Sequence, residues 1–236
     1  MSTHDSLLIR ASTEAPGEES PQPIYESVNP AVLAKIPMGA RNLLDIGCGS
    51  GALGAAAKRR GELQVTGVTH SAVEATMARQ HIDAVVLADL NAFDPLPLGC
   101  FDCIVCSHVL EHLGDPDEVL RRLRELLSPG GVLVVALPNV LFWKQRLQFA
   151  RGRFRYADGG LMDRTHVRFF DWDTAAELIE QAGFVIVERV ADGGLPLSSR
   201  FGRRGSQMLD GIALRRFPGL FGFQFVFVCG VRAGSA

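Results

Sequence analysis

The chain has 236 residues, of which 47% are hydrophobic and 21% charged, so it holds enough apolar material for one sizeable core. Its formal net charge of −2 and pI near 6.3 exclude an overall field that would draw it to nucleic acid or anionic membranes. No apolar run reaches the length of a bilayer span, and the run Leu7–Ile9 is too short for a signal peptide. We therefore expect a cytoplasmic protein without nucleic-acid or membrane partners.

The cysteines fit that location, because their odd number, five, favours free thiols over disulfides. Cys100, Cys103 and Cys106 have the spacing of a metal-binding ladder. However, Cys103 and Cys106 fall on one predicted strand at odd separation, so their side chains point to opposite faces. The better interpretation is a set of buried free thiols.

The predicted elements begin after a polar leader over residues 1–23, whose proline, glycine and glutamate content is typical of flexible chain. Residues 24–236 are expected to form a single domain. A short helix is predicted from Asn29 to Ile36. Strands are expected over 42–46, 65–68, 84–88, 101–107, 132–137, 185–190 and 223–231, with helices at 51–61, 71–81, 115–127 and 174–183.

Two helix boundaries carry specific signals. Asp115 and Pro116 offer an N-cap and a first-turn proline, and the run 128–131 (SPGG) is expected to end that helix. Thr174 and Glu177 have the spacing of a capping box. Repeated strand–helix alternation predicts an α/β fold with a doubly wound parallel sheet. In such a sheet the ligand site lies outside the carboxyl end of the first strand.

Two insertions interrupt the alternation, over residues 138–170 and 192–222. The first interleaves aromatic residues with lysine and arginine. One interpretation is an amphipathic helix that covers the core and exposes a basic face. The other is a lid over a pocket that receives an anionic group of a substrate.

The run 43–54 (LLDIGCGSGALG) is the most informative stretch. A short apolar strand ends beside Asp45, and Gly47, Gly49 and Gly51 then alternate before a helix. Glycines here would let a ligand approach the bare backbone. Gly47, Gly49 and Ala52 also satisfy the looser dinucleotide-binding pattern, which is weak evidence by itself.

Asp45 two residues before the first glycine, and Gly51 as the third glycine, resemble D-x-G-x-G-x-G, the first motif of the class I S-adenosylmethionine-dependent methyltransferases. The resemblance implies a Rossmann-like, seven-stranded sheet. It is mostly parallel, and the last strand is inserted antiparallel between the fifth and sixth. It also implies S-adenosylmethionine as the cofactor, with Asp45 orienting the glycine turn or receiving the methionine ammonium through water.

The resemblance has one departure, at the end of the second strand. Related enzymes usually carry an acid there that binds both ribose hydroxyls, but this chain has Thr69. The missing acid also counts against a nicotinamide dinucleotide enzyme. A subset of methyltransferases, including the cyclopropane-forming lipid enzymes, resembles this variant, and the matching position that could supply a carboxylate is Glu74. The alternative is that Glu74 is a solvated helix residue.

Other cofactor contacts follow from the same resemblance. Asp89 matches the acid that meets the adenine amino group, and Leu90 would pack on the ring. The backbone of Ser107 and His108 would line the methionine side.

The run 108–112 (HVLEH) also matches the inverted zinc-peptidase pattern H-x-x-E-H. That site needs both histidines on one helix and a further ligand. Here the run straddles a strand end and a turn, so we expect no metal.

The run 163–170 (DRTHVRFF) resembles a segment found after the fifth strand in bacterial methyltransferases of small-molecule and glycan pathways. A functional interpretation makes His166 the general base, with His112 as the competing candidate. A structural interpretation pairs Asp163 with Arg168 and lets the aromatic residues anchor the loop. Candidate substrate contacts are Tyr25, Trp143, Asp163 and Arg168.

The sequence therefore predicts a methyltransferase that acts on oxygen or nitrogen of a small-molecule acceptor, of the kind found in secondary metabolism. In one alternative the enzyme uses the same cofactor but catalyses its cyclisation by intramolecular attack, giving azetidine-2-carboxylate and methylthioadenosine. A third hypothesis is a protein that binds S-adenosylmethionine without turnover. The oligomeric state stays open, with a homodimer among the options.

Overall fold

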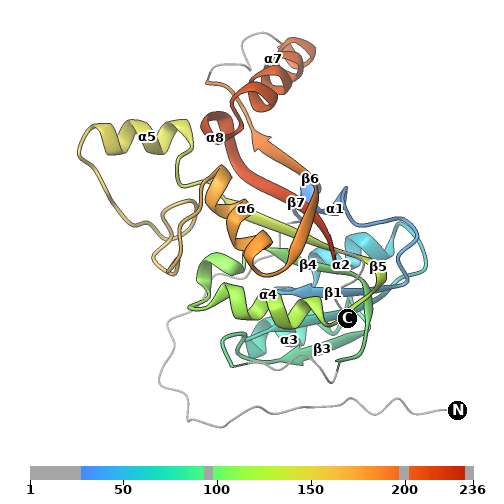
Figure 1. Cartoon of the computed structure of the whole chain (residues 1–236). Helices are drawn as coiled ribbons and strands as arrows, with labels where there is room; N and C mark the ends of the chain where they lie inside the picture. The colour runs from blue at the N-terminus through green and yellow to red at the C-terminus, as the bar shows by residue number, and fades with distance from the viewer. Residues whose placement is uncertain (1–27, 93–97, 197–201, 232–236) are drawn as a thin grey trace, which may run out of the picture.

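The computed structural model describes residues 28–92, 98–196 and 202–231. The predicted leader 1–23 and Tyr25 lie outside them. The described chain forms one seven-stranded sheet of order β3-β2-β1-β4-β5-β7-β6 (Figure 1). β1 to β5 are parallel, and β7 runs antiparallel to both β5 and β6. The predicted Rossmann-like α/β sheet, with its inserted antiparallel last strand, is confirmed.

Most element positions agree with the sequence prediction. The strands are β1 Asn42–Ile46, β2 Gln64–Thr69, β3 Ala84–Leu87, β4 Phe101–Ser107, β5 Leu127–Pro138, β6 Phe184–Gly193 and β7 Gly222–Val231. The helices are α1 Pro30–Leu33, α2 Ala52–Lys58, α3 Ala72–Ala78, η2 Leu110–His112, α4 Pro116–Arg124, α5 Trp143–Ala150, α6 Trp172–Gln181, α7 Gly202–Arg216 and α8 Pro218–Phe221.

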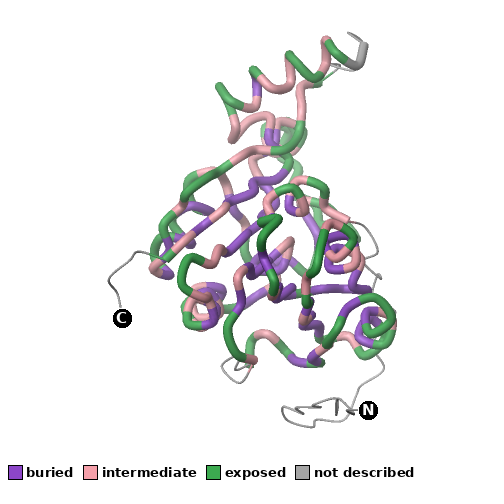
Figure 2. Tube along the Cα trace, turned by 90° about the vertical axis from the view of Figure 1, so that its right-hand side faces the viewer, coloured by how far each residue is buried: buried purple, intermediate pink, exposed green. Residues whose placement is uncertain are grey.

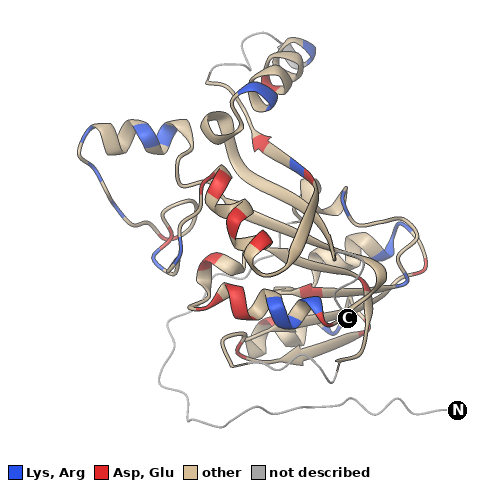
Figure 3. Cartoon of the chain, viewed as in Figure 1, with Lys and Arg blue, Asp and Glu red and all other residues tan. Residues whose placement is uncertain are grey.

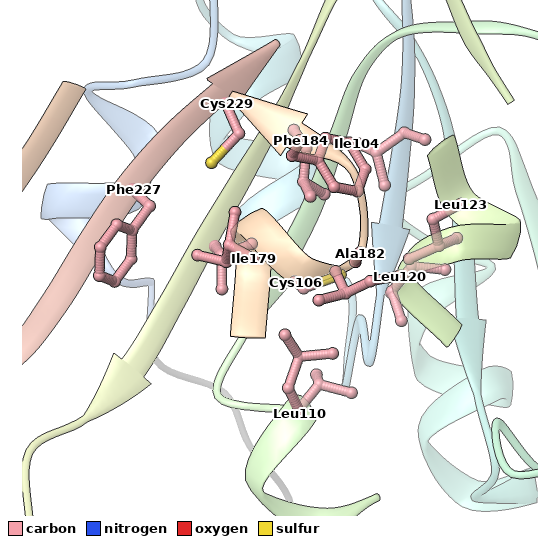
Figure 4. Packing of buried hydrophobic residues seen from close by; sticks show 14 of the residues in the cluster. Ile104, Cys106, Leu110, Leu120, Leu123, Ile179, Ala182, Phe184, Phe227 and Cys229 are labelled. Carbon is pink, nitrogen blue, oxygen red and sulfur yellow. The ribbon is translucent and has the colours of Figure 1, made fainter. Parts of the chain in front are cut away.

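Alternate strand residues face two separate cores, and Figure 2 shows buried chain running through the middle of the molecule. One core lies under α4 and α6, where Ile179 and Phe184 pack near Cys106 and Leu110 (Figure 4). The other lies under α1, α2 and α3. Cys103 belongs to this second core, so the prediction that Cys103 and Cys106 face opposite ways is confirmed.

The five cysteines are free, as expected. Cys48, Cys103, Cys106 and Cys229 are buried, but Cys100 is exposed, so the prediction of a wholly buried set is wrong at that position. Cys100 lies just before β4, where the chain is still on the surface.

The prediction is also wrong around residues 124–131. Helix α4 begins as predicted, with Asp115 as its N-cap and Pro116 in its first turn, but it ends at Arg124. β5 already begins at Leu127 and includes the SPGG run. The pairing jumps from Phe101↔Leu127 to Cys103↔Val132, so the run forms an irregularity inside the strand.

The predicted capping box on Thr174 and Glu177 is wrong in its register. The N-cap of α6 is Asp171, whose carboxylate accepts hydrogen bonds from the backbone N–H groups of Asp173 (3.1 Å) and Thr174 (2.9 Å). The Thr174 hydroxyl lies 2.9 Å from the backbone nitrogen of Asp171 and closes the box. Aspartate and threonine at this spacing replace the Ser/Thr and Glu that the pattern required.

The helix of the first insertion does not cover the core, although Phe170 at the end of the insertion belongs to it. None of the residues of α5 is buried, and Figure 1 shows the helix standing away from the sheet. The insertion is closed at its base, because Asn139 and Phe170 form a β-bridge across its two ends. α7 and α8 belong to the second insertion, between β6 and β7. Among the described residues, no helix combines the length and the apolar character that crossing a membrane requires.

The capping assignment predicts that Asp171→Ala lowers the free energy of unfolding by about 1 kcal/mol, because two N-terminal N–H groups of α6 lose their acceptor. Urea denaturation measures this change. Glu177→Ala is the matched control and should have little effect, since Glu177 is exposed. Equal losses from both variants would contradict the assignment.

Candidate functional site

The turn after β1 adopts a backbone that favours glycine. Gly47, Gly49 and Gly51 have φ values of 71°, 52° and 83°. A Cβ on Gly47 would overlap a methyl group of Val109, and one on Gly51 would lie 3.1 Å from the Cα of Ala78. The turn is held against β2, since the N–H groups of Gly47 and Cys48 donate to the carbonyl of Val68. The sequence pattern therefore marks a backbone that is bare for steric reasons.

Asp45 brings a buried carboxyl group to the end of β1. It is 2% exposed, and its Oδ2 has no hydrogen-bond partner among the described residues. Burial raises the pKa of Asp45 from 3.8 to about 7. An orphaned buried oxygen beside an open backbone turn is suited to a positively charged or hydrogen-bonding ligand.

A buried carboxylate from α3 lies at the end of β2, beside Thr69. Thr69 ends β2, and its hydroxyl donates a hydrogen bond of 2.7 Å to Oε2 of Glu74. Glu74 lies in the first turn of α3, where its N–H donates to the Ser71 side chain. Both residues are buried, with exposures of 2% and 7%. The alternative that Glu74 is a solvated helix residue is therefore wrong.

Asp89 and Leu90 follow β3 at the same edge of the sheet. Asp89 is exposed, and its Oδ1 accepts from the backbone N–H of Asn91 (2.9 Å) and from its side-chain Nδ2 (3.1 Å). Leu90 is half-buried and packs against the core. The N–H of Ala88 donates to the carbonyl of Thr69, which ties this segment to the end of β2.

Ser107 ends β4, and the next residue, His108, is the only non-glycine among the described residues with a positive φ, 56°. Its Nε2 lies 2.8 Å from Oε1 of Gln224, and its Nδ1 lies 3.3 Å from Oε1 of Glu111. Burial acts to lower the pKa of His108, but its contacts with Glu111 and Gln224 outweigh burial and raise it.

Gln224 and Glu111 were not predicted as site residues. Gln224 reaches His108 because β7 is inserted beside β5, and it also contacts Asn29 and Asp192. Glu111 stood inside the H-x-x-E-H run. It is fully buried and its Oε2 has no partner among the described residues.

The two candidate bases come together. The rings of His112 and His166 are 4.8 Å apart between centroids and meet edge to face. His166 is buried, and burial lowers its pKa, so its ring is neutral near pH 7. Its Nδ1 has no partner in hydrogen-bond geometry, and its Nε2 lies 4.0 Å from Oε1 of Glu111.

A short chain of polar groups sets the orientation of His112. The hydroxyl of Thr165 lies 2.6 Å from Oδ1 of Asp163 and 3.0 Å from Nδ1 of His112. The hydroxyl has one proton, and the ionised carboxylate can only accept, so the proton points to Asp163. Nδ1 of His112 must then donate to Thr165, which leaves the lone pair on Nε2. Hydrogen bonds from Thr165 also lower the pKa of Asp163, against the effect of burial.

The proposed pairing of Asp163 with Arg168 is wrong. The guanidinium of Arg168 donates instead to the carbonyl of Gly114 (2.6 Å), which fastens the loop to the segment before α4. Trp143, another candidate substrate contact, begins α5 and packs on Phe142. The structure does not bring Trp143 to the histidine pair.

Glu111, His112 and His166 are also the residues that could hold a metal ion, since one ligand atom of each lies within 4.8 Å of the others. The zinc-peptidase arrangement itself is absent, because residues 110–112 form a single 3₁₀ turn and His108 points to Gln224. Of the three residues in this cluster, His166 lies outside the sequence pattern, and His108 is not a member.

Comparison with known proteins shows the family to which this chain belongs. Residues 7–189 match the methyltransferase domain family. The chain belongs to this family. The D-x-G-x-G-x-G turn thus marks a class I S-adenosylmethionine-dependent methyltransferase, as the resemblance implied.

Curated relatives of the methyltransferase match its sequence over part of their length. It is 32% identical over 130 residues to the ubiquinone biosynthesis O-methyltransferase of Psychrobacter arcticus, covering 52% of this chain and 50% of that one. It is 34% identical over 134 residues to the enzyme of the same name from Xanthomonas campestris pv. campestris, covering 51% and 54%. The chain thus spans about half the length of the curated relatives it matches.

Solved structures show the same fold at low identity. A S-adenosylmethionine-dependent methyltransferase from Archaeoglobus fulgidus superposes with a TM-score of 0.59 at 20% identity, covering 81% of this chain and 86% of that one. The [4+2]-cyclase SpnF superposes with a TM-score of 0.55 at 19% identity, covering 83% and 76%.

The buried state of Asp45 predicts a pH-dependent cost to stability. Because its folded pKa is raised, stability falls as pH rises from about 4 to about 7, by up to about 4 kcal/mol. Asp45→Asn, which cannot ionise, should therefore be up to about 4 kcal/mol more stable than the wild type at pH 8 and equal to it near pH 4. Thermal unfolding across pH measures the difference, with the exposed Asp158→Asn as control. A difference that does not change with pH would contradict the prediction.

The Thr69–Glu74 pair predicts a defect in nucleoside binding. Glu74→Gln should weaken binding of S-adenosylhomocysteine about tenfold or more, since a charged hydrogen-bond acceptor becomes neutral. Calorimetric titration measures the affinity. Glu62→Gln, at an exposed glutamate, is the control and should bind as the wild type does. Unchanged affinity in Glu74→Gln would remove this residue from the cofactor site.

Proposed function

We propose that the chain is an S-adenosylmethionine-dependent O-methyltransferase that acts on a hydroxyl group of a small molecule. The observation that carries the proposal is the set of groups at the carboxyl ends of β1 and β2: three left-handed glycines, an orphaned buried carboxyl and a buried Thr69–Glu74 pair. They provide a bare backbone for close approach, a site for a cation and an acceptor for hydroxyl groups.

These groups fit the cofactor that the family uses. The glycine turn and Asp45 would hold the methionine part, together with the backbone at Ser107 and His108. Glu74 would accept from ribose hydroxyls, with Thr69 holding its carboxylate in place. Asp89 and Leu90 would meet the adenine. The bound cofactor supplies a methyl group on a positively charged sulfur, ready for direct displacement.

The chain's own contribution is alignment of the acceptor and removal of its proton. Of the two candidate bases, the hydrogen bonds support His112. Thr165 and Asp163 leave the Nε2 lone pair of His112 free, and His112 is partly exposed. His166 would hold the His112 ring from its edge, as a buried neutral imidazole.

Attack by oxygen rather than nitrogen is supported by the relatives, which are named O-methyltransferases of ubiquinone biosynthesis. That name also differs from the secondary metabolism that the sequence suggested. Because the match covers about half of those relatives, we extend to this chain only the reaction class and a hydroxylated acceptor. A cytoplasmic location and the oligomeric state remain predictions.

Product analysis tests the proposal against the alternatives. The purified chain is incubated with S-adenosylmethionine, alone or with a panel of hydroxylated small molecules, and the nucleoside product is identified by mass spectrometry. S-adenosylhomocysteine that appears only with an acceptor is the expected result. Methylthioadenosine formed without an acceptor would instead identify the self-cyclising enzyme, and binding without any product would identify a non-enzymatic protein.

Single variants test the base. His112→Gln should lower kcat about 100-fold or more while binding S-adenosylhomocysteine as the wild type does. Thr165→Val should lower kcat with little change in KM, because it removes the group that orients His112. A larger loss in His166→Gln than in His112→Gln would make His166 the base. Loss of activity in EDTA, restored by zinc, would instead assign the cluster of Glu111, His112 and His166 to a metal.

A further inference from the structure

A cavity lies between the two insertions, and none of the residues of the glycine turn line it. Its volume is about 470 Å³, within the range of roughly 300–1,000 Å³ typical of small-molecule sites. Lys144 and Arg155 line it from the first insertion, and Gly193 and Phe223 line it from the β6–β7 edge. Neither insertion could form this cavity alone.

The charged side chains that line the cavity are basic, and the ammonium of Lys144 lies 5.5 Å from the centroid of the Trp143 ring. Lys144 and Arg155 are its only charged lining residues, and neither forms an ion pair with a carboxylate of the described residues. Figure 3 shows basic residues along α5 and the chain after it, whereas α6 carries acids. Four acids adjoin lining residues in the chain or in space, Asp158, Asp163, Asp192 and Asp210, but none of them lines the cavity. Each has another partner: Asp158 pairs with Arg164, Asp163 accepts from Thr165, Asp192 accepts from Gln224, and Asp210 accepts from the N–H of Leu195.

The rest of the lining is largely apolar. The rings of Phe142 and Phe223 meet edge to face at 5.7 Å, and Met162 is buried beside them. An apolar wall with two unpaired cations is complementary to a molecule that has an apolar body and an anionic group.

The frame around the cavity is rigid where the insertions meet. The side-chain amide of Asn139, fully buried, donates to the carbonyls of Gly222 (2.8 Å) and Gly219 (3.0 Å). Gly193 has no room for a side chain, since a Cβ would lie 2.6 Å from the backbone nitrogen of Phe223. These contacts fix the backbone at the β6–β7 side of the cavity.

The cavity is connected to the histidine pair through one short loop. Leu161 and Met162 line it, and Asp163, Thr165 and His166 follow directly in the chain. The carbonyl of Met162 accepts from the N–H of Ala157, which holds this loop in place. The backbone of Leu161 also lies near enough to His166 to influence its pKa.

We propose that this cavity binds the anionic end of the methyl acceptor, a carboxylate or a phosphate, with Lys144 and Arg155 as the recognition groups. The proposal rests on the proposed function, because it names the class of acceptor for that site. Its apolar body would lie against Phe142, Phe223 and Met162. Its hydroxyl group would reach the histidine pair along the loop 161–166.

Three matched probes test the recognition: 1-naphthoate, 1-naphthyl phosphate and the neutral 1-naphthylmethanol, titrated calorimetrically into the full chain. At least one of the anions should bind ten times or more tightly than the neutral probe. The stronger of the two anions identifies the group as carboxylate or phosphate. Equal affinity for all three probes would overturn the proposal.

Variants locate the site. Lys144→Gln/Arg155→Gln should weaken the anion about tenfold or more and leave the neutral probe unchanged. Arg151→Gln/Arg153→Gln is the matched control, because both arginines are exposed in the same insertion but do not line the cavity. Unchanged anion affinity in the first variant, or an equal loss in the control, would overturn the proposal. All four substitutions are at exposed side chains.

The two proposals can fail separately. S-adenosylhomocysteine binding and product formation are measured on the same preparations. Turnover of neutral acceptors with no preference for anionic ones would overturn the cavity assignment and leave the O-methyltransferase intact. Anion binding at Lys144 and Arg155 without any methyl transfer would overturn the function and leave the anion site in place.

Discussion

Two features at the end of β1 lower the stability of the folded chain, and a turn that binds no ligand would need neither of them. The backbone there takes three left-handed conformations within five residues, and the strand ends beside a carboxyl group removed from water. A buried, unpartnered oxygen on Asp45 lowers stability whenever the group is ionised. A cationic ligand bound close to this backbone, as proposed above, would offset both costs. The buried pair of Thr69 and Glu74 lies at the end of the neighbouring strand β2.

The sequence was a good guide wherever the information was local or the sheet was regular. Alternating strands and helices, together with the motif at Asp45, predicted the strand positions and the inserted last strand. The predictions failed where a local signal had two solutions. Thr174 could begin a helix or complete a cap begun at Asp171, and the SPGG run could end a helix or lie in an irregular strand. For the SPGG run, pairing with β4 decides between the two, whereas the cap depends on which of two neighbouring polar residues accepts the first N–H groups of the helix.

Prediction of the site residues from the sequence succeeded and failed in a similar way. The residues of the cofactor turn were predictable because neighbours in sequence are neighbours in space. Gln224 was not, because its role arises from a contact with His108 made across the sheet. Glu111 is only three residues from His108, but its contacts with the loop at residues 166–168 form only in the folded chain. The partnership of His112 with His166 was equally hidden, since the loop at residues 163–166 folds back over the turn after β4. The N–H groups of Val167 and Arg168 donate to the carbonyl of Glu111 and hold it there.

The inserted strand β7 joins the surroundings of His108 to the cavity between the insertions. Gln224 and Phe223 are consecutive, so they point to opposite faces of the sheet. Gln224 holds His108 next to the end of β4, while Phe223 packs on Phe142 and lines the cavity between the insertions. The carbonyl of Phe223 also accepts from the N–H of Asn139, where the first insertion begins. Because β7 is antiparallel to β5, it begins at the edge of the sheet where the glycine turn lies. A parallel strand in its place would begin at the opposite edge. The second insertion, which leads into β7, is therefore brought to the edge of the glycine turn, and two neighbouring residues of β7 contact both His108 and the cavity.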